Sequence, residues 1–327
     1  MTRRRRWIKG GSVNKPAVPC DPEIVPDSEH RSLIARLPAR WRDFALLARF
    51  DRPIGWWLLF WPCVWGVMLA GGEQQWQLVL WLLAGAIAMR GAGCVYNDIV
   101  DADLDRKVAR TASRPVASGR VRRSAAWAWL LALCGVGLLV LLQLRWQAQA
   151  VALASIAPVA AYPFMKRITW WPQAWLGLVF SWGALVGWVE VDTCDGHLGA
   201  LAALYLGSIA WVIGYDTIYA LQDREDDALV GIRSSALAMG ARVTGGVAGF
   251  YAVAVLMWGL AFWMIRADWL AFVALAPMAV HLAGQVVTLR QGDGENVLAR
   301  FRSNRDAGLL MALACWVVGN GGGGICS

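Results

Sequence analysis

The segment NDIVDADLDRK (Asn97–Lys107) places four aspartates within eight residues, directly after a mainly apolar run. That run, residues 76–96, is long enough to cross a hydrocarbon layer of about 30 Å as an α-helix, which takes about 20 residues. At about 100° per residue, the four-residue spacing puts Asn97, Asp101 and Asp105 toward one face of a helix. The segment therefore predicts a membrane helix that ends in a cluster of carboxylates.

The rest of the chain has the composition of a polytopic membrane protein. Of its 327 residues, 58% are hydrophobic and 17% are charged, and the mean hydropathy is +0.45. The apolar runs are continuous and do not alternate, which favours α-helices over a closed β-barrel. We predict an all-α bundle of about nine transmembrane helices, at residues 53–72, 76–96, 124–143, 148–164, 170–189, 198–219, 243–265, 268–289 and 306–319. The last run is short and precedes GNGGGGICS, so a partial or tilted span is the alternative there.

Basic residues predict which helix ends face the cytoplasm, because short loops rich in Lys and Arg stay on that side. The even-numbered loops carry almost all of the Lys and Arg found between the spans, and seven of these lie from Arg106 to Arg123. The N-terminal part is also strongly basic, so the N-terminus and the even-numbered loops are expected to be cytoplasmic. The net charge of +8 is then a topology signal, and we expect no nucleic-acid partner.

The N-terminal part differs in character from the rest. MTRRRRW is followed by no apolar stretch of the kind found in signal peptides. Residues 32–50 mix Arg with large apolar side chains at near-helical spacing. We predict a basic cytoplasmic tail with an interfacial amphipathic helix over residues 1–48 and one transmembrane domain over residues 49–327. The expected location is the bacterial cytoplasmic (inner) membrane, with the mitochondrial inner membrane as the alternative.

A second acidic cluster ends the predicted sixth span. In YDTIYALQDREDD (Tyr215–Asp227), Asp216, Asp223 and Asp227 are seven and four residues apart and share a helix face. Both clusters end on the cytoplasmic side, on different helices, so they can face each other. Because Mg²⁺ joins carboxylates to substrate phosphates, the pair predicts a diphosphate ligand whose organic tail enters the membrane. The alternatives are solvated, aspartate-rich helix ends or the ion site of an ion-coupled transporter.

These segments carry a family resemblance. NDIVDADLDRKVARTASRPVASG resembles the first aspartate-rich motif of the UbiA superfamily of intramembrane prenyltransferases, and DREDD followed by GIRSSA resembles the second. FDRPIGWWLLFWPCVWG and YDTIYALQDREDD resemble its 4-hydroxybenzoate polyprenyltransferase branch in particular. The similarity extends roughly from Arg49 to Asn304. Two departures are Ser235, where family members commonly have Thr, and the GGGGICS ending.

The resemblance implies a bundle of nine transmembrane helices around a central cavity that opens toward the cytoplasm and toward lipid. It implies that two Mg²⁺ ions on the diphosphate are held by Asn97, Asp101, Asp223 and Asp227, with support from Asp98, Asp105 and Asp216. It also implies a set of substrate-binding residues: Arg52, Arg90, Arg110, Arg114, Tyr162 and Lys166. For Arg110 and Arg114 the alternative is contact with lipid headgroups, and for Arg90 it is an internal salt bridge.

The implied reaction is Mg²⁺-dependent transfer of a polyprenyl group from polyprenyl diphosphate to the ring carbon ortho to the hydroxyl of 4-hydroxybenzoate, as in ubiquinone biosynthesis. Metal ions and basic side chains would neutralise the leaving diphosphate, and apolar walls would keep water from the allylic cation. The expected catalytic residues are Asp216, Asp223 and Arg52. We hypothesise that Asp216 or another aspartate of the second motif polarises the acceptor hydroxyl, and that Arg52 receives its carboxylate. A different aromatic acceptor is the alternative.

Overall fold

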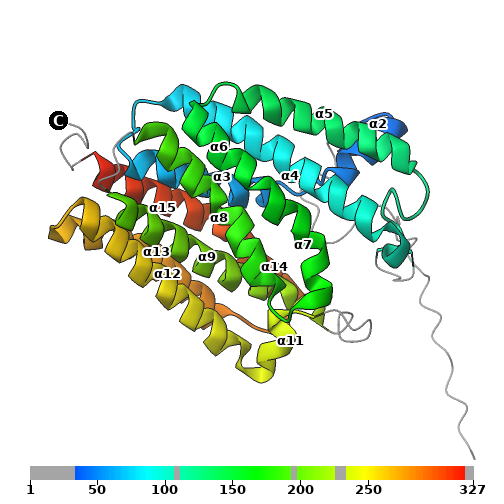
Figure 1. The fold of residues 1–327 in the computed structure, drawn as a ribbon. Coiled ribbons are helices and arrows are strands. Elements are labelled where there is room, and N and C mark those ends of the chain that lie inside the picture. Colours follow the sequence, from blue (N-terminus) through cyan, green and yellow to red (C-terminus); the bar gives the residue numbers. More distant parts are fainter. Residues whose placement is uncertain (1–33, 107–110, 193–196, 225–232, 321–327) are drawn as a thin grey trace, which may run out of the picture.

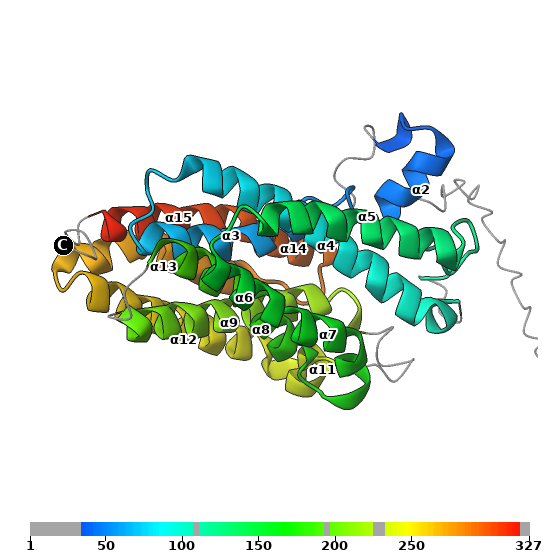
Figure 2. The same ribbon diagram turned by 45° about the horizontal axis from the view of Figure 1, so that its top comes forward.

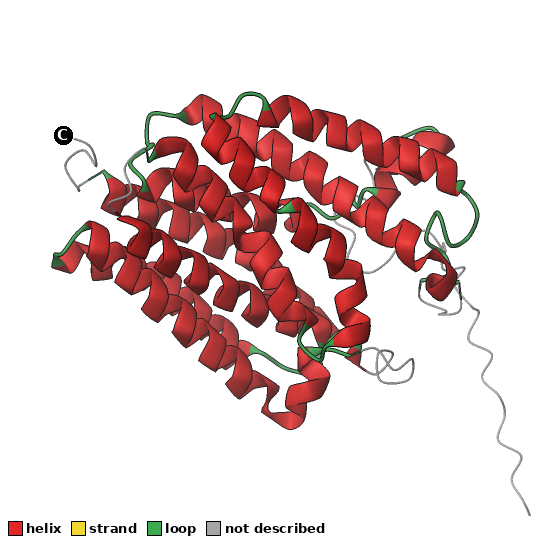
Figure 3. Ribbon diagram, in the orientation of Figure 1, coloured by secondary structure: helices red, strands yellow, loops and turns green. Residues whose placement is uncertain are grey.

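The computed structural model describes residues 34–106, 111–192, 197–224 and 233–320. Within these residues all regular structure is helical, as Figure 3 shows, which confirms the predicted fold class. The elements are α2 (Ala39–Leu47), α3 (Ile54–Leu69), α4 (Trp76–Asp105), α5 (Arg123–Leu141), α6 (Trp146–Ala154), α7 (Ile156–Ile168), α8 (Pro172–Val191), α9 (Leu198–Ala220), α11 (Ser235–Met239), the 3₁₀ turn η2 (Gly240–Arg242), α12 (Val243–Ile265), α13 (Trp269–Thr288), α14 (Gly294–Arg302) and α15 (Asn304–Gly319).

Each predicted span contains a helix, but the helices differ in length from the predicted spans. In the described part of the chain, seven helical segments are long and apolar enough to cross a membrane, with α6 and α7 joined in one of them and α11 and α12 in another. The protein is thus a multi-pass membrane protein. The first predicted span is α3, an apolar helix of 16 residues, and the ninth is α15, also of 16 residues. At 1.5 Å per residue each measures about 24 Å, less than the thickness of a bilayer core.

Six of the helices close into a ring. α3 packs on α8, α8 on α9, α9 on α12, α12 on α13, α13 on α15, and α15 returns to α3. The α4–α5 pair joins the ring beside α3, and α6 and α7 lie against α8 (Figures 1 and 2). Glycine permits close packing of α3 on α8, because a Cβ at Gly66 of α3 would collide with the backbone of Ala184 in α8.

The interior of the ring is filled by three fully buried tryptophans, Trp65, Trp211 and Trp258. The Trp65 ring lies 4.9 Å from Trp211 and 5.5 Å from Trp258, centroid to centroid. Indole N–H groups buried in a lipid-surrounded bundle need acceptors. Trp65 Nε1 donates to Gly308 O at 2.9 Å, and Trp211 Nε1 donates to Asn304 Oδ1 at 2.9 Å. These bonds connect α3 and α9 to α15.

The basic loops gather at one end of the bundle. In Figures 1 and 2 the ends of α4, α7 and α9 and the starts of α3, α5 and α12 lie toward the right-hand side, with α2 beside them. The loops predicted to be cytoplasmic therefore share one end of the bundle. Helix α2, within the segment predicted as interfacial, is held there by an ion pair of 3.0 Å between Arg120 and Asp43 and by Phe44 against Trp129.

Candidate active site between α4 and α9

A cavity of about 1650 Å³ runs from the end of the bundle where the basic loops lie into its apolar interior. Its inner walls come from α4, α5 and α8 and include Leu82, Val140 and Phe180. Its outer part carries charged groups. A ligand with an anionic head and a long hydrocarbon tail matches this division of the walls.

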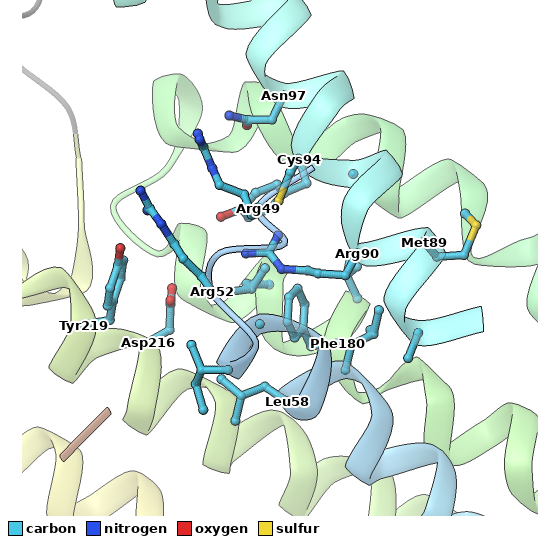
Figure 4. Close-up of a pocket in the computed structure, with 18 of the residues that line it drawn as sticks. Arg49, Arg52, Leu58, Met89, Arg90, Cys94, Asn97, Phe180, Asp216 and Tyr219 are labelled. Atoms are coloured by element: carbon cyan, nitrogen blue, oxygen red, sulfur yellow. The ribbon is translucent and has the colours of Figure 1, made fainter. Parts of the chain in front are cut away.

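The two acidic helix ends face this cavity from different sides. Figure 4 shows Arg90, Cys94 and Asn97 of α4 on one side of the cavity and Asp216 and Tyr219 of α9 on the other. Arg49 and Arg52, from the α2–α3 connection, lie between them. Asp98 and Asp223 also line the cavity. Helices far apart in the sequence therefore bring their polar groups to one space, as the sequence predicts.

Two arginines form ion pairs with aspartates of the first motif. Arg49 Nη2 donates to Asp98 Oδ1 at 3.1 Å, and Arg114 Nη1 donates to the same oxygen at 3.3 Å and to Asp105 Oδ2 at 2.7 Å. Asp105 thus shares a partner with Asp98. The physical reason is that a four-residue repeat drifts by about 40° per step, so that after two steps Asp105 is only about 20° from Asp98 around the helix.

Two polar atoms on the α4 side are buried and have no hydrogen-bond partner: Asn97 Oδ1 and Arg90 Nε. Burial of an unpaired polar atom is costly, so such atoms at a cavity wall indicate a ligand contact. The Arg90 guanidinium lies 5.5 Å from the centre of the Phe180 ring. Arg90 makes no ion pair within the described residues, so the alternative of an internal salt bridge finds no support.

The other predicted site residues divide into three groups. Arg52, Tyr162, Asp216 and Asp223 line the cavity. Asp101 is 5% exposed and is not among the cavity-lining residues. Arg110 and Asp227 lie outside the described residues, and for Lys166 only the backbone, in α7, is described.

The described residues contain no group of three or more His, Cys, Asp or Glu side chains close enough to hold a metal ion. Asp227, which the resemblance names as a ligand, lies outside them. The oxygen donors that do face the cavity, the Asn97 amide and the Asp216 and Asp223 carboxylates, are of the type that Mg²⁺ prefers. The residues present therefore fit a hard divalent cation bridged to phosphate.

The structure adds residues that were not singled out from the sequence. Arg49 lies in the left-handed region at φ 58°, and its position in ARFDRPIG contains no signal for an ion pair with a helix 49 residues away. Tyr219 lies three residues after Asp216, and the helical spacing could have placed it on the same wall. Helix α14, in the predicted eighth loop, adds Leu298 and Arg302 to the cavity.

Residues 59–316 match the UbiA prenyltransferase family. The chain belongs to this family. It is 40% identical over 285 residues to the 4-hydroxybenzoate polyprenyltransferase, mitochondrial, of Drosophila pseudoobscura pseudoobscura, covering 86% of this chain and 72% of the relative. It is 38% identical over 318 residues to the human protein of the same name, covering 95% of this chain and 84% of the relative.

Solved UbiA structures share the fold. The apo structure of a UbiA homologue from Aeropyrum pernix superposes with a TM-score of 0.67 at 24% identity, covering 80% of this chain and 97% of that one. A UbiA homologue from Archaeoglobus fulgidus bound to GPP and Mg²⁺ superposes with a TM-score of 0.63 at 15% identity, covering 85% of this chain and 99% of that one. At these identities the likeness establishes the fold.

Proposed function

We propose that this UbiA family enzyme transfers a polyprenyl group from polyprenyl diphosphate to the ring carbon ortho to the hydroxyl of 4-hydroxybenzoate and releases diphosphate. The observation that carries the proposal is one cavity that joins the polar ends of α4 and α9 to an apolar interior. The names of the curated relatives support the aromatic acceptor. Family membership favours this enzyme over the ion-coupled transporter.

Mg²⁺ is the metal we propose, as two ions, and when bound it neutralises charge on the leaving diphosphate. Asn97 and Asp101 of α4, with Asp223 and Asp227 of the second motif, are the proposed ligands. The unpaired oxygen of Asn97 supports this role.

The proposed diphosphate-binding residues are four basic residues: Arg90, Arg110, Arg114 and Lys166. Of these, Arg90 and Arg114 line the cavity. Guanidinium groups offer several N–H donors in a planar array that suits phosphate oxygens. Arg90 Nε is buried and its guanidinium group lies 5.5 Å from the centre of the Phe180 ring. A charge that is partly shielded from water acts more strongly on a developing anion.

The acceptor is proposed to lie between Arg52 and Asp216, with Tyr162 nearby. The Arg52 guanidinium would receive the carboxylate, and Asp216 would accept the hydroxyl proton in a hydrogen bond, which raises electron density on the ring. Figure 4 supports this arrangement, because both side chains point into the cavity. The apolar walls would exclude water while the new C–C bond forms.

The compartment is a separate proposal. The relatives are named mitochondrial, whereas the sequence pattern favours a bacterial cytoplasmic membrane. In either case we propose that the N-terminus and the active site face the side of the basic loops. Protease protection of a tag at the N-terminus, in sealed membranes of known orientation, measures this.

The function is tested with purified protein, 4-hydroxybenzoate, a long polyprenyl diphosphate and Mg²⁺, followed by mass spectrometry of the lipid extract. The expected result is a prenylated 4-hydroxybenzoate that disappears with EDTA and returns with added Mg²⁺. Parallel reactions use homogentisate or a naphthoate as the acceptor. Product from one of these acceptors, with none from 4-hydroxybenzoate, would overturn the acceptor assignment.

A further inference from the structure

Asp98 lies between two guanidinium groups at the cavity wall. Arg49 Nη2 is 3.1 Å from its Oδ1, and Arg114 Nη1 is 3.3 Å from the same atom. The second oxygen of Asp98 also accepts from Arg49, at 3.3 Å. The Asp98 side chain is 1% exposed, whereas the arginines keep 16% and 23% of their side-chain surface exposed. The carboxylate is therefore covered, and the guanidinium groups are the accessible part of the cluster.

Each arginine is held at a second point as well. Arg114 also binds Asp105 at 2.7 Å, two helical turns beyond Asp98. Arg49 has a positive φ of 58° and donates to Leu46 O at 3.4 Å. Both arginines line the cavity. A guanidinium group has five N–H donors, and both ion pairs of Arg114 use Nη1.

The charges around Asp98 do not suit a metal ligand. Two guanidinium groups within hydrogen-bond distance already offset its single negative charge, and a divalent cation on the same carboxylate would lie close to both of them. Asn97, one residue earlier, presents a buried oxygen with no partner. Adjacent residues of α4 thus offer different chemistry: Asn97 offers a free oxygen for a metal, and Asp98 an anchor for arginines.

We propose that Asp98 is a positioning residue, which holds the guanidinium groups of Arg49 and Arg114 toward the diphosphate of the prenyl donor and does not bind Mg²⁺. This replaces the supporting metal role expected for Asp98 from the family resemblance. It also adds Arg49 to the residues that bind the donor. The inference rests on the proposed function, because it concerns how the same site binds the diphosphate.

The test compares Asp98→Asn with two variants of the same helix. Asp101→Asn removes a proposed metal ligand, and Asp103→Asn is the matched control, because Asp103 is 71% exposed and pairs with Arg123 at the surface. For each variant we would measure the KM of donor and of acceptor, the Ki of inorganic diphosphate, and Mn²⁺ affinity by electron paramagnetic resonance without turnover.

For Asp98→Asn the inference predicts a rise of about tenfold or more in the donor KM and in the Ki of inorganic diphosphate, since charge-assisted hydrogen bonds to phosphate are lost. Acceptor KM and Mn²⁺ affinity stay within about twofold of the wild type. Asp101→Asn weakens Mn²⁺ binding by about tenfold, and Asp103→Asn changes none of these quantities. A fall in Mn²⁺ affinity for Asp98→Asn as large as that for Asp101→Asn overturns the inference, and so does an unchanged diphosphate Ki.

Variants of Arg49 keep the test decisive if Asp98→Asn does not fold. Arg49→Ala should raise the diphosphate Ki as Asp98→Asn does, Arg49→Lys should restore part of the loss, and Mn²⁺ affinity should not move in either. Unchanged diphosphate binding in Arg49→Ala contradicts the inference. Wild-type protein that gives no prenylated product would instead refute the proposed function, so the two failures can be told apart.

Discussion

Replacing Gly55 by alanine should disturb the active site while leaving the fold almost unchanged. A Cβ at Gly55 would lie 2.6 Å from Arg90 Nε, where an ordinary contact begins at 3.4 Å. The guanidinium group must therefore shift by about 0.8 Å. Because this group is the end of a flexible side chain, the shift costs little, and the higher helix propensity of alanine offsets it by up to about 1 kcal/mol. Displacement of a binding group by about 1 Å can lower activity about 100-fold.

We therefore expect Gly55→Ala to lower kcat/KM for prenyl transfer by about 10- to 100-fold, with a thermal midpoint in detergent close to that of the wild type. Mass spectrometric initial rates and thermal unfolding of the same preparation measure the two quantities. Gly135→Ala in α5 is the matched control, because a Cβ there meets nothing within 4 Å. Activity of Gly55→Ala within twofold of the wild type, alongside an inactive Arg90→Ala, would refute the reasoning.

Three further predictions concern stability. Tyr251→Phe removes a buried hydrogen bond of 2.9 Å to Gln285 Oε1. It should lower the free energy of unfolding by about 1 kcal/mol without changing the KM of donor or acceptor. Lower activity at an unchanged thermal midpoint would contradict this. Met311→Ala truncates a fully buried side chain of α15 and should lower the free energy of unfolding by about 2–5 kcal/mol. The loss should appear as a large drop in thermal midpoint. A midpoint equal to that of the wild type would mean that α15 is not packed on the bundle. Arg123→Ala breaks a surface ion pair to Asp103 at 2.6 Å and should change stability by less than about 1 kcal/mol; a larger loss would give this pair a structural role.

Helical periodicity and loop charge were sufficient to predict the general arrangement of the site. Both depend on local sequence, because spacing determines which side chains share a face and Lys and Arg determine which loops share a side. Asp216 and Asp223 line the same cavity as Asn97 and Asp98 of the first motif. Asp105 shows the limit of the four-residue rule, because the accumulated drift brings it to Arg114 beside Asp98.

Features that depend on tertiary contacts could not be predicted in the same way. The ion pair from Arg49 to Asp98 joins residues 49 positions apart, through a backbone conformation that has no sequence signature at an arginine. The short helix α14 lies in a segment whose sequence predicts a basic loop, and it reaches the cavity by packing on α9 and α15. Helices α3 and α15, of 16 residues each, also pack against each other within the ring.

The central claim is that the polar ends of α4 and α9 together bind the metal-bound diphosphate. The most direct measurement is a structure determined with Mn²⁺ and a non-reactive polyprenyl diphosphate analogue, in which anomalous scattering locates the metal. We predict metal density between Asn97 and Asp101 on one side and Asp223 on the other, with the diphosphate against Arg49 and Arg114. Metal density bound to one helix alone, or a diphosphate outside this cavity, would contradict the account.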